Sequence, residues 1–136
     1  MTDEAIAVAT LESNDGLPNV LGRPEPAHLI LRCRKGRIDA YVSTESALDS
    51  SWRYSTVRGQ HRFAGKAARP FVGNTSTSND SVFLRNPVSW LVLFKANEGT
   101  SWLVELPLRN RLPATVTFEL TGATKAVDMV TSACGT

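Results

Sequence analysis

The sequence contains two cysteines, Cys33 and Cys134, and their positions constrain the fold more than any other feature. Cys33 ends a strand-like run in which Leu29, Leu31 and Cys33 fall on the same face. Cys134 follows residues 123–133, where apolar side chains recur at helical spacing. Both cysteines are therefore predicted to point into a hydrophobic core, one from an early strand and one from the end of a C-terminal helix.

Two interpretations of this cysteine pair are open from the residues alone. Free cysteines behave as small apolar side chains and are commonly buried. The alternative is a disulfide, which requires the two Cα atoms to lie within about 7 Å. A bridge that closes so large a loop would stabilise the fold by roughly 4–5 kcal/mol in the chain-entropy model, and it would indicate an oxidising compartment.

The rest of the pattern predicts one mainly β domain, which 136 residues with a hydrophobic content of 42% can support. A hairpin opens this domain, because residues 28–33 and 37–42 are strand-like and Gly36 between them can adopt the positive φ of a tight turn. Alternating or apolar runs predict further strands at residues 55–63, 82–84, 101–108 and 114–120.

Two helices complete the predicted fold. Asn86 followed by Pro87 is typical of a helix start, so residues 88–96 are expected to form a short internal helix, although their apolar character also fits a buried strand. Residues 123–133 form the C-terminal helix. Residues 43–52 are expected to be a loop or short helix, and residues 73–81 a polar loop or strand end.

Residues 1–27 are predicted to be an N-terminal arm that precedes a single domain at residues 28–136. Pro24 and Pro26 mark the expected boundary, and a short helix is expected near Ala5–Leu11. The first residues are acidic and lack the basic and apolar pattern of a signal peptide. This start leaves a virion or the cytoplasm as alternatives to a periplasmic location.

Catalytic motifs are sparse in this sequence. It contains no G-x-S-x-G, no H-E-x-x-H and no phosphate-binding loop. His28 and His61 lie far apart and have no ligand-like spacing to the cysteines. The sequence therefore favours a protein that is not an enzyme and that needs no metal or cofactor.

Basic residues in the strand predicted at residues 55–63 are the candidate binding site. Arg58 and Arg62 share its outer face, His61 lies beside them, and a polar loop leads to Asp80. Together these side chains could hold a carboxylate, a phosphate or a glycan acid. The alternative is a solvated strand face that binds nothing.

Three further observations bound the class of partner. A net charge of +2 is too small to indicate nucleic-acid binding, and no apolar run approaches the length of about 18 residues that a membrane-spanning helix needs. Trp52, Trp90 and Trp102 could form a binding platform, but at least two of them are expected to pack in the core or at its rim.

An ordered set of segments in residues 28–136 resembles the type VI secretion-associated TagO/VasI family. The segments are Leu29-Ile30-Leu31-Arg32-Cys33, Asp39-Ala40-Tyr41-Val42, Val57-Arg58, Ala114-Thr115-Val116-Thr117-Phe118-Glu119-Leu120-Thr121-Gly122, and then Ala126 and Ala133-Cys134-Gly135. The resemblance implies a small protein with β-sandwich-like antiparallel sheets and a disulfide between the two cysteines. It also implies a periplasmic accessory role without enzymatic activity.

These observations lead to three hypotheses. The first is a non-enzymatic accessory or binding protein of the bacterial envelope that contacts other proteins of an assembly and has an oxidised cysteine pair. The second is a structural subunit of a phage or phage-like particle, whose arm at residues 1–27 contacts neighbours and which could form a homo-oligomer. The third is a small-ligand binder or hydrolase in which Arg58, His61 and Asp80 converge on a pocket that takes an anionic ligand.

Overall fold

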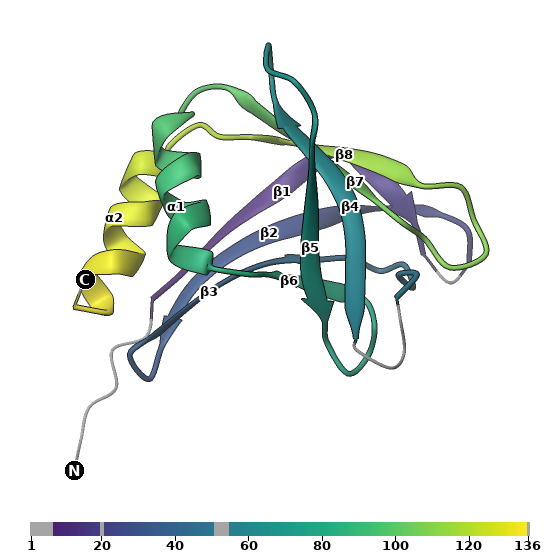
Figure 1. The fold of residues 1–136 in the computed structure, drawn as a ribbon, viewed down its shortest axis with the longest axis horizontal. Helices are drawn as coiled ribbons and strands as arrows, with labels where there is room; N and C mark the ends of the chain where they lie inside the picture. Colours follow the sequence, from purple (N-terminus) through teal and green to yellow (C-terminus); the bar gives the residue numbers. More distant parts are fainter. Residues whose placement is uncertain (1–6, 20, 51–54, 136) are drawn as a thin grey trace.

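The computed structural model describes residues 7–19, 21–50 and 55–135, and this part of the chain forms eight strands and two helices (Figure 1). The strands are β1 (Ala7–Pro18), β2 (Pro24–Arg34), β3 (Arg37–Ser43), β4 (Thr56–Phe63), β5 (Arg69–Thr75), β6 (Ser81–Leu84), β7 (Ser101–Leu106) and β8 (Ala114–Glu119). The helices are α1 (Pro87–Ala96) and α2 (Ala123–Ala133). The prediction of a mainly antiparallel β fold with one short internal helix and a C-terminal helix is confirmed.

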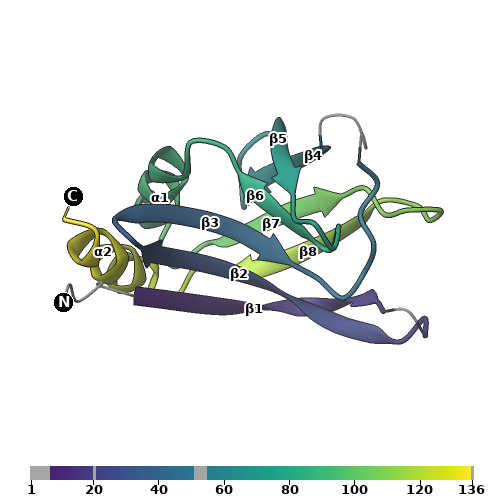
Figure 2. The same ribbon diagram turned by 90° about the horizontal axis from the view of Figure 1, so that it is seen from below.

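All eight strands belong to one antiparallel sheet in the order β1-β2-β3-β6-β5-β4-β7-β8. The sheet curls until its first and last strands meet. There the backbone N–H of Thr117 in β8 donates to Oδ1 of Asp15 in β1 at 2.8 Å. Figure 2 shows the halves of the curled sheet facing each other, so one sheet provides the sandwich-like arrangement that the resemblance implied for separate sheets.

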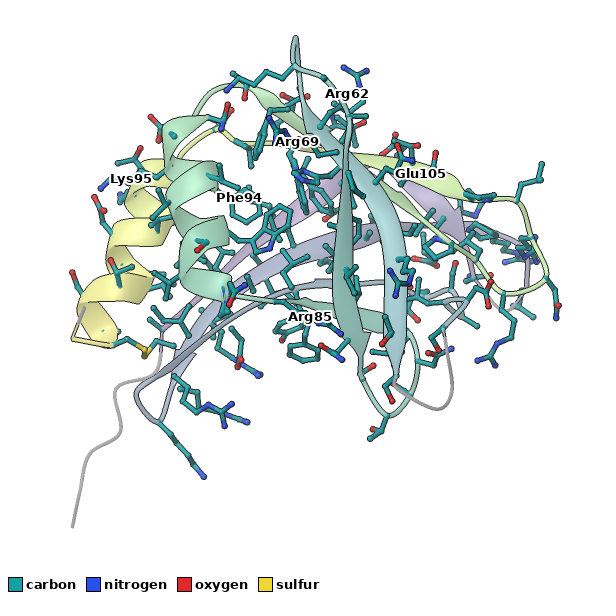
Figure 3. The ribbon with its side chains drawn as sticks, in the orientation of Figure 1. Arg62, Arg69, Arg85, Phe94, Lys95 and Glu105 are labelled. Carbon is teal, nitrogen blue, oxygen red and sulfur yellow. A yellow bond between two sulfur atoms is a disulfide. The ribbon has the colours of Figure 1, made fainter. Side chains whose placement is uncertain are left out.

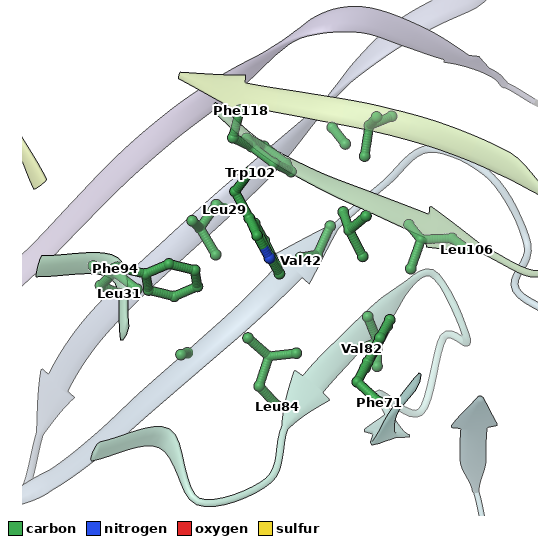
Figure 4. Close-up of a cluster of buried hydrophobic side chains, with 14 of the residues drawn as sticks. Leu29, Leu31, Val42, Phe71, Val82, Leu84, Phe94, Trp102, Leu106 and Phe118 are labelled. Atoms are coloured by element: carbon green, nitrogen blue, oxygen red, sulfur yellow. The ribbon is translucent and has the colours of Figure 1, made fainter. Parts of the chain in front are cut away.

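The space between the two halves is filled by side chains from the inner faces of the strands (Figure 4). Leu29 of β2, Val42 of β3, Trp102 of β7 and Phe118 of β8 all have an exposed fraction of 0%. Burial of a large apolar side chain stabilises a fold by roughly 1.5–3 kcal/mol, so this cluster is the main source of stability. The alternation of buried and exposed residues along the strands follows from the two-residue period of a β-strand.

The two helices pack side by side and cover one end of the sheet (Figure 1). α1 begins after Asn86, with Pro87 in its first turn as predicted, but the Asn86 side chain makes no capping hydrogen bond. The helix buries Leu91 and Phe94. On its exposed side, Nζ of Lys95 lies 2.7 Å from Oδ1 of Asp128 in α2.

The predicted hairpin is the pair β2–β3. Residues 35 and 36 form its turn, and both have positive φ, 54° for Lys35 and 72° for Gly36. Two consecutive residues of positive φ are the mark of the tight turns that suit the right-handed twist of paired strands. The turn places Arg34 directly opposite Arg37 in the strand register.

The N-terminal prediction needs correction. The helix expected near Ala5–Leu11 is wrong from Ala7 onward, because those residues belong to β1, which pairs with β2. Ala7, Ala9 and Leu11 pack against the core and alternate with exposed residues, which is a strand period and not a helical one. Pro24 and Pro26, expected to mark a boundary, lie inside β2 instead.

β5 is a strand that the sequence analysis did not predict. Its sequence contains Pro70 and Gly73, which weaken a strand pattern. Gly73 is required by close packing, because a Cβ at this position would lie 2.7 Å from the carbonyl oxygen of Phe83 in the neighbouring strand. The expected polar loop is shorter than predicted, since residues 73–75 end β5 and residue 81 begins β6.

Candidate functional site

Of the four candidate binding residues, His61 and Arg62 line one depression with a volume of about 260 Å³, whereas Arg58 and Asp80 are not part of its lining. Arg58 and Arg62 are exposed on the outer face of β4, as predicted. His61 lies on the opposite, inner face with Val57 and Phe63, and its exposed fraction is only 9%. The reason is the two-residue period of the strand, which puts residues 57, 61 and 63 on one side and residues 58 and 62 on the other.

Asp80 lies apart from the other three candidates, in the turn between β5 and β6. The hydroxyl groups of Ser78 and Ser76 donate to its Oδ1 at 2.6 Å and 3.3 Å. Among the described residues, neither Arg58 nor Arg62 forms an ion pair with it. Because Arg58 and His61 lie on opposite faces of β4, the structure does not support the hypothesis that Arg58, His61 and Asp80 converge on one pocket.

His61 belongs to a buried aromatic cluster. Its Nδ1 accepts a hydrogen bond from Nε1 of Trp102 at 3.1 Å, and its ring centre lies 4.7 Å from that of Trp90. Burial lowers the pKa of His61 below 6.5, and the positive charge of Arg69 lowers it further. Trp90 and Trp102 are structural, as expected, whereas Trp52 lies outside the described residues.

Cys33 and Cys134 form a disulfide, which confirms the predicted pairing. Their Cα atoms are 5.7 Å apart, and the bond joins the end of β2 to the residue that follows α2. Cys33 is fully buried and directly precedes Arg34. The bridge therefore fixes the β2–β3 hairpin close to its turn.

A larger group of mostly charged side chains converges on the outer face of this hairpin. They line a depression with a volume of about 350 Å³, and we call it the hairpin depression. Its lining consists of Arg32, Arg34, Lys35, Arg37, Asp39 and Phe83. Figure 1 shows the β2–β3 turn at the lower left, whereas Figure 3 labels Arg62 near the top of the molecule, so the depression is separate from the predicted site.

One arginine of the hairpin depression is held in place. Nη2 of Arg32 lies 2.7 Å from Oδ2 of Asp39, and Nε of Arg32 donates to the same oxygen at 3.2 Å. The guanidinium carbon of Arg32 is 5.2 Å from the ring centre of Tyr41. Tyr41 in turn stacks on Phe83, with ring centres 4.6 Å apart. The floor of the depression is therefore ordered by an ion pair and an aromatic stack.

The other three cations of the depression lack an acidic partner in the part of the chain that the structure describes. Arg34, Lys35 and Arg37 are exposed, and within the described residues none of them forms an ion pair. The full chain has 15 Lys and Arg against 13 Asp and Glu. The lining of the depression holds four cations and one carboxylate, a formal charge of +3, which exceeds the net charge of +2 of the whole chain.

Sequence reasoning missed the hairpin depression although its signal is present. The two strands and the turn at Gly36 were predicted, but the candidate site was assigned to the basic residues of the strand at 55–63. In an antiparallel hairpin the segment Arg34-Lys35-Gly36-Arg37 brings three cations to one tip. The contribution of Phe83 could not be read in the same way, because it depends on the pairing of β3 with β6.

Comparison with protein-family models, with curated proteins and with solved structures finds no match for this sequence. Among the described residues, no group of three or more His, Cys, Asp or Glu side chains is placed to hold a metal ion. None of the described helices has the length and apolar character needed to cross a membrane.

Proposed function

We propose that this chain is an accessory binding protein of the bacterial envelope and not an enzyme. The observation that carries the proposal is the hairpin depression, where three cations that have no ion pair within the described residues share a lining with an ordered Arg32. A surface of this kind attracts an anionic partner and gives the encounter its orientation. The resemblance to the TagO/VasI family supports an accessory role in an envelope assembly.

The disulfide supports a location in an oxidising compartment such as the periplasm. Disulfides persist in exported proteins and are rare in the reducing cytoplasm. The bond between Cys33 and Cys134 also adjoins the proposed binding surface, because Cys33 directly precedes Arg34. Oxidation would therefore both stabilise the fold and fix the hairpin that presents the cations.

The location is tested on protein from its native source. Thiols are blocked before lysis, and the mass of the protein is measured without reduction. We expect no blocked cysteine, because both sulfur atoms are in the disulfide. Two blocked thiols in natively exported protein would contradict the proposal.

The binding role is tested by photo-crosslinking in the same source. One variant carries a photoreactive residue at Arg37 in the hairpin, and a control carries it at Lys125, which is exposed on α2. We expect an adduct of defined mass from position 37 that unlabelled protein suppresses, and no such adduct from position 125. Equal labelling from both positions, or none from the hairpin, would argue against this surface.

The alternative of a particle subunit depends on residues 1–27 acting as an arm on a neighbouring subunit. The described part of that segment includes β1, which pairs with β2 of the same chain. No observation therefore favours the particle over the envelope.

A further inference from the structure

The tip of the β2–β3 hairpin carries its positive charge at a cost to its own stability. Arg34 lies directly opposite Arg37, and like charges in directly opposed strand positions destabilise a sheet. Two positions further from the turn, by contrast, Arg32 lies opposite Asp39 and forms an ion pair with it at 2.7 Å. The charges are therefore balanced within the hairpin and unbalanced at its tip.

The turn contains a second unfavourable feature, which is the backbone conformation of Lys35. Lys35 has a φ of 54°, in the left-handed region where glycine and asparagine are favoured and a long side chain is uncommon. Lysine at this position adds a cation between Arg34 and Arg37 where asparagine would suit the backbone better. A residue kept in a strained conformation at a surface site points to a functional use of its side chain.

The residue types that line the depression restrict the class of ligand that it can bind. Phosphate sites commonly use a cradle of backbone N–H groups, but the hairpin depression is lined by side chains of paired strands. At the hairpin tip a single small anion would meet only exposed, solvated cations. Several carboxylates on one chain could contact Arg34, Lys35 and Arg37 together, and multivalent attachment of this kind raises affinity strongly.

The one acidic side chain of the lining, Asp39, further restricts the class of ligand. Asp39 is already paired with Arg32, and it would repel an anionic group that reached the inner end of the depression. Next to it lies Phe83, which offers an apolar contact. A polypeptide fits this combination, because it can place carboxylates at the tip and neutral backbone or apolar side chains further in.

We propose that the hairpin depression binds an acidic polypeptide segment of a partner protein, with two or more carboxylates held by Arg34, Lys35 and Arg37. This inference rests on the proposed binding function and names the chemistry of the partner. The association is electrostatic at the hairpin tip, so added salt weakens it.

The test measures the binding of a fluorescently labelled octaglutamate peptide by anisotropy, with octaglutamine as the neutral control. Wild-type protein is compared with a triple variant, Arg34→Gln, Lys35→Asn and Arg37→Gln. A second triple variant, Arg109→Gln, Arg111→Gln and Lys125→Gln, removes the same charge from exposed positions elsewhere. Thermal unfolding of each variant shows that it is folded.

We expect the hairpin variant to bind octaglutamate at least about tenfold more weakly than wild type, and the control variant to change by less than about twofold. Equal weakening in both variants would show attraction by net charge alone and would overturn the inference. Unchanged binding in the hairpin variant would overturn it as well.

Inorganic phosphate, added as a competitor, separates this inference from the proposed function. We expect phosphate to displace the peptide only at concentrations where general salt screening acts. Displacement at micromolar phosphate would identify a small phosphorylated ligand and overturn the peptide assignment, while position-specific crosslinking at residue 37 would still support a binding surface. Loss of that crosslinking would instead reject the proposed function.

Discussion

The indole Nε1 of Trp102 donates a hydrogen bond to Nδ1 of His61 at 3.1 Å, inside the aromatic cluster between α1 and the sheet. An imidazole that accepts at Nδ1 carries its proton on Nε2 and is neutral. Protonation at Nδ1 would place two donors against each other. This hydrogen bond therefore couples the charge state of His61 to the packing of a fully buried tryptophan.

The stability of the fold should decrease below pH 6.5 because of His61. Burial and then Arg69 lower the pKa of folded His61 below its ordinary value of 6.5. Its contribution to the free energy of unfolding is fully present above pH 6.5 and is lost as the pH falls through the lower pKa of the folded state, because the unfolded chain takes up the proton first. Urea unfolding between pH 5 and pH 8 measures this, expressed as a slope against pH on the order of one proton or less.

The control for this pH dependence is His61→Gln, which cannot titrate but keeps a side-chain acceptor. Its stability should depend less on pH than that of wild type over the same range. The two proteins differ at position 61 alone, so a difference between their pH profiles isolates this side chain. Parallel pH profiles for the two proteins would remove His61 as the cause.

Replacement of Trp102 by phenylalanine should cost more than the same replacement of Trp90. Trp102 is fully buried and donates to His61, whereas Trp90 is only partly buried. Trp102→Phe loses ring volume and leaves the His61 acceptor without its donor, which together should lower the free energy of unfolding by about 2–4 kcal/mol. Trp90→Phe should cost about half as much or less. Chemical denaturation at pH 7 compares the two, and equal losses would mean that the hydrogen bond contributes little.

The disulfide should contribute several kcal/mol to stability. The bond joins residues 101 positions apart, so it restricts the unfolded chain strongly. The double variant Cys33→Ala, Cys134→Ala should lose about 2–5 kcal/mol, and a reductant should destabilise wild type by a similar amount. Urea unfolding with and without reductant measures both effects. The double variant serves as the control, because reductant should leave its unfolding curve unchanged; a shift there would implicate something other than this bond.

The sequence predicted those elements whose pattern is local. The bounds of α2 follow from its apolar spacing, and the β2–β3 hairpin follows from two strand-like runs around Gly36. β1 was not predicted, because the prolines and glycines in and after this segment indicated an irregular arm. Its alternating residues are partly buried only because β1 pairs with β2. β5 lies between β6 and β4, and it is held by neighbours that local propensity does not reveal.

The candidate site shows the same division. The face of the strand that carries Arg58 and Arg62 was predicted correctly, since it depends on the two-residue period alone. The inward position of His61 also follows from that period. It was missed because a histidine beside two arginines suggested an anion-binding site. The contribution of Phe83 to the hairpin depression required knowledge that β6 pairs with β3, which no local pattern contains.

Lys35→Asn should make the protein more stable even though it removes a charge from the proposed binding surface. Lys35 has a φ of 54°, and asparagine tolerates this left-handed conformation better than lysine does. The change also removes a cation between Arg34 and Arg37, which are directly opposed. We expect a gain of a few tenths to about 1 kcal/mol in the free energy of unfolding, measured by urea denaturation at low salt. The same substitution at Lys125, on the exposed side of α2, is the matched control, and it should be neutral or destabilising because asparagine is a poor helix former. If Lys35→Asn were instead as destabilising as Lys125→Asn, the turn would not be strained, and the argument that its lysine is kept for binding would lose its physical basis.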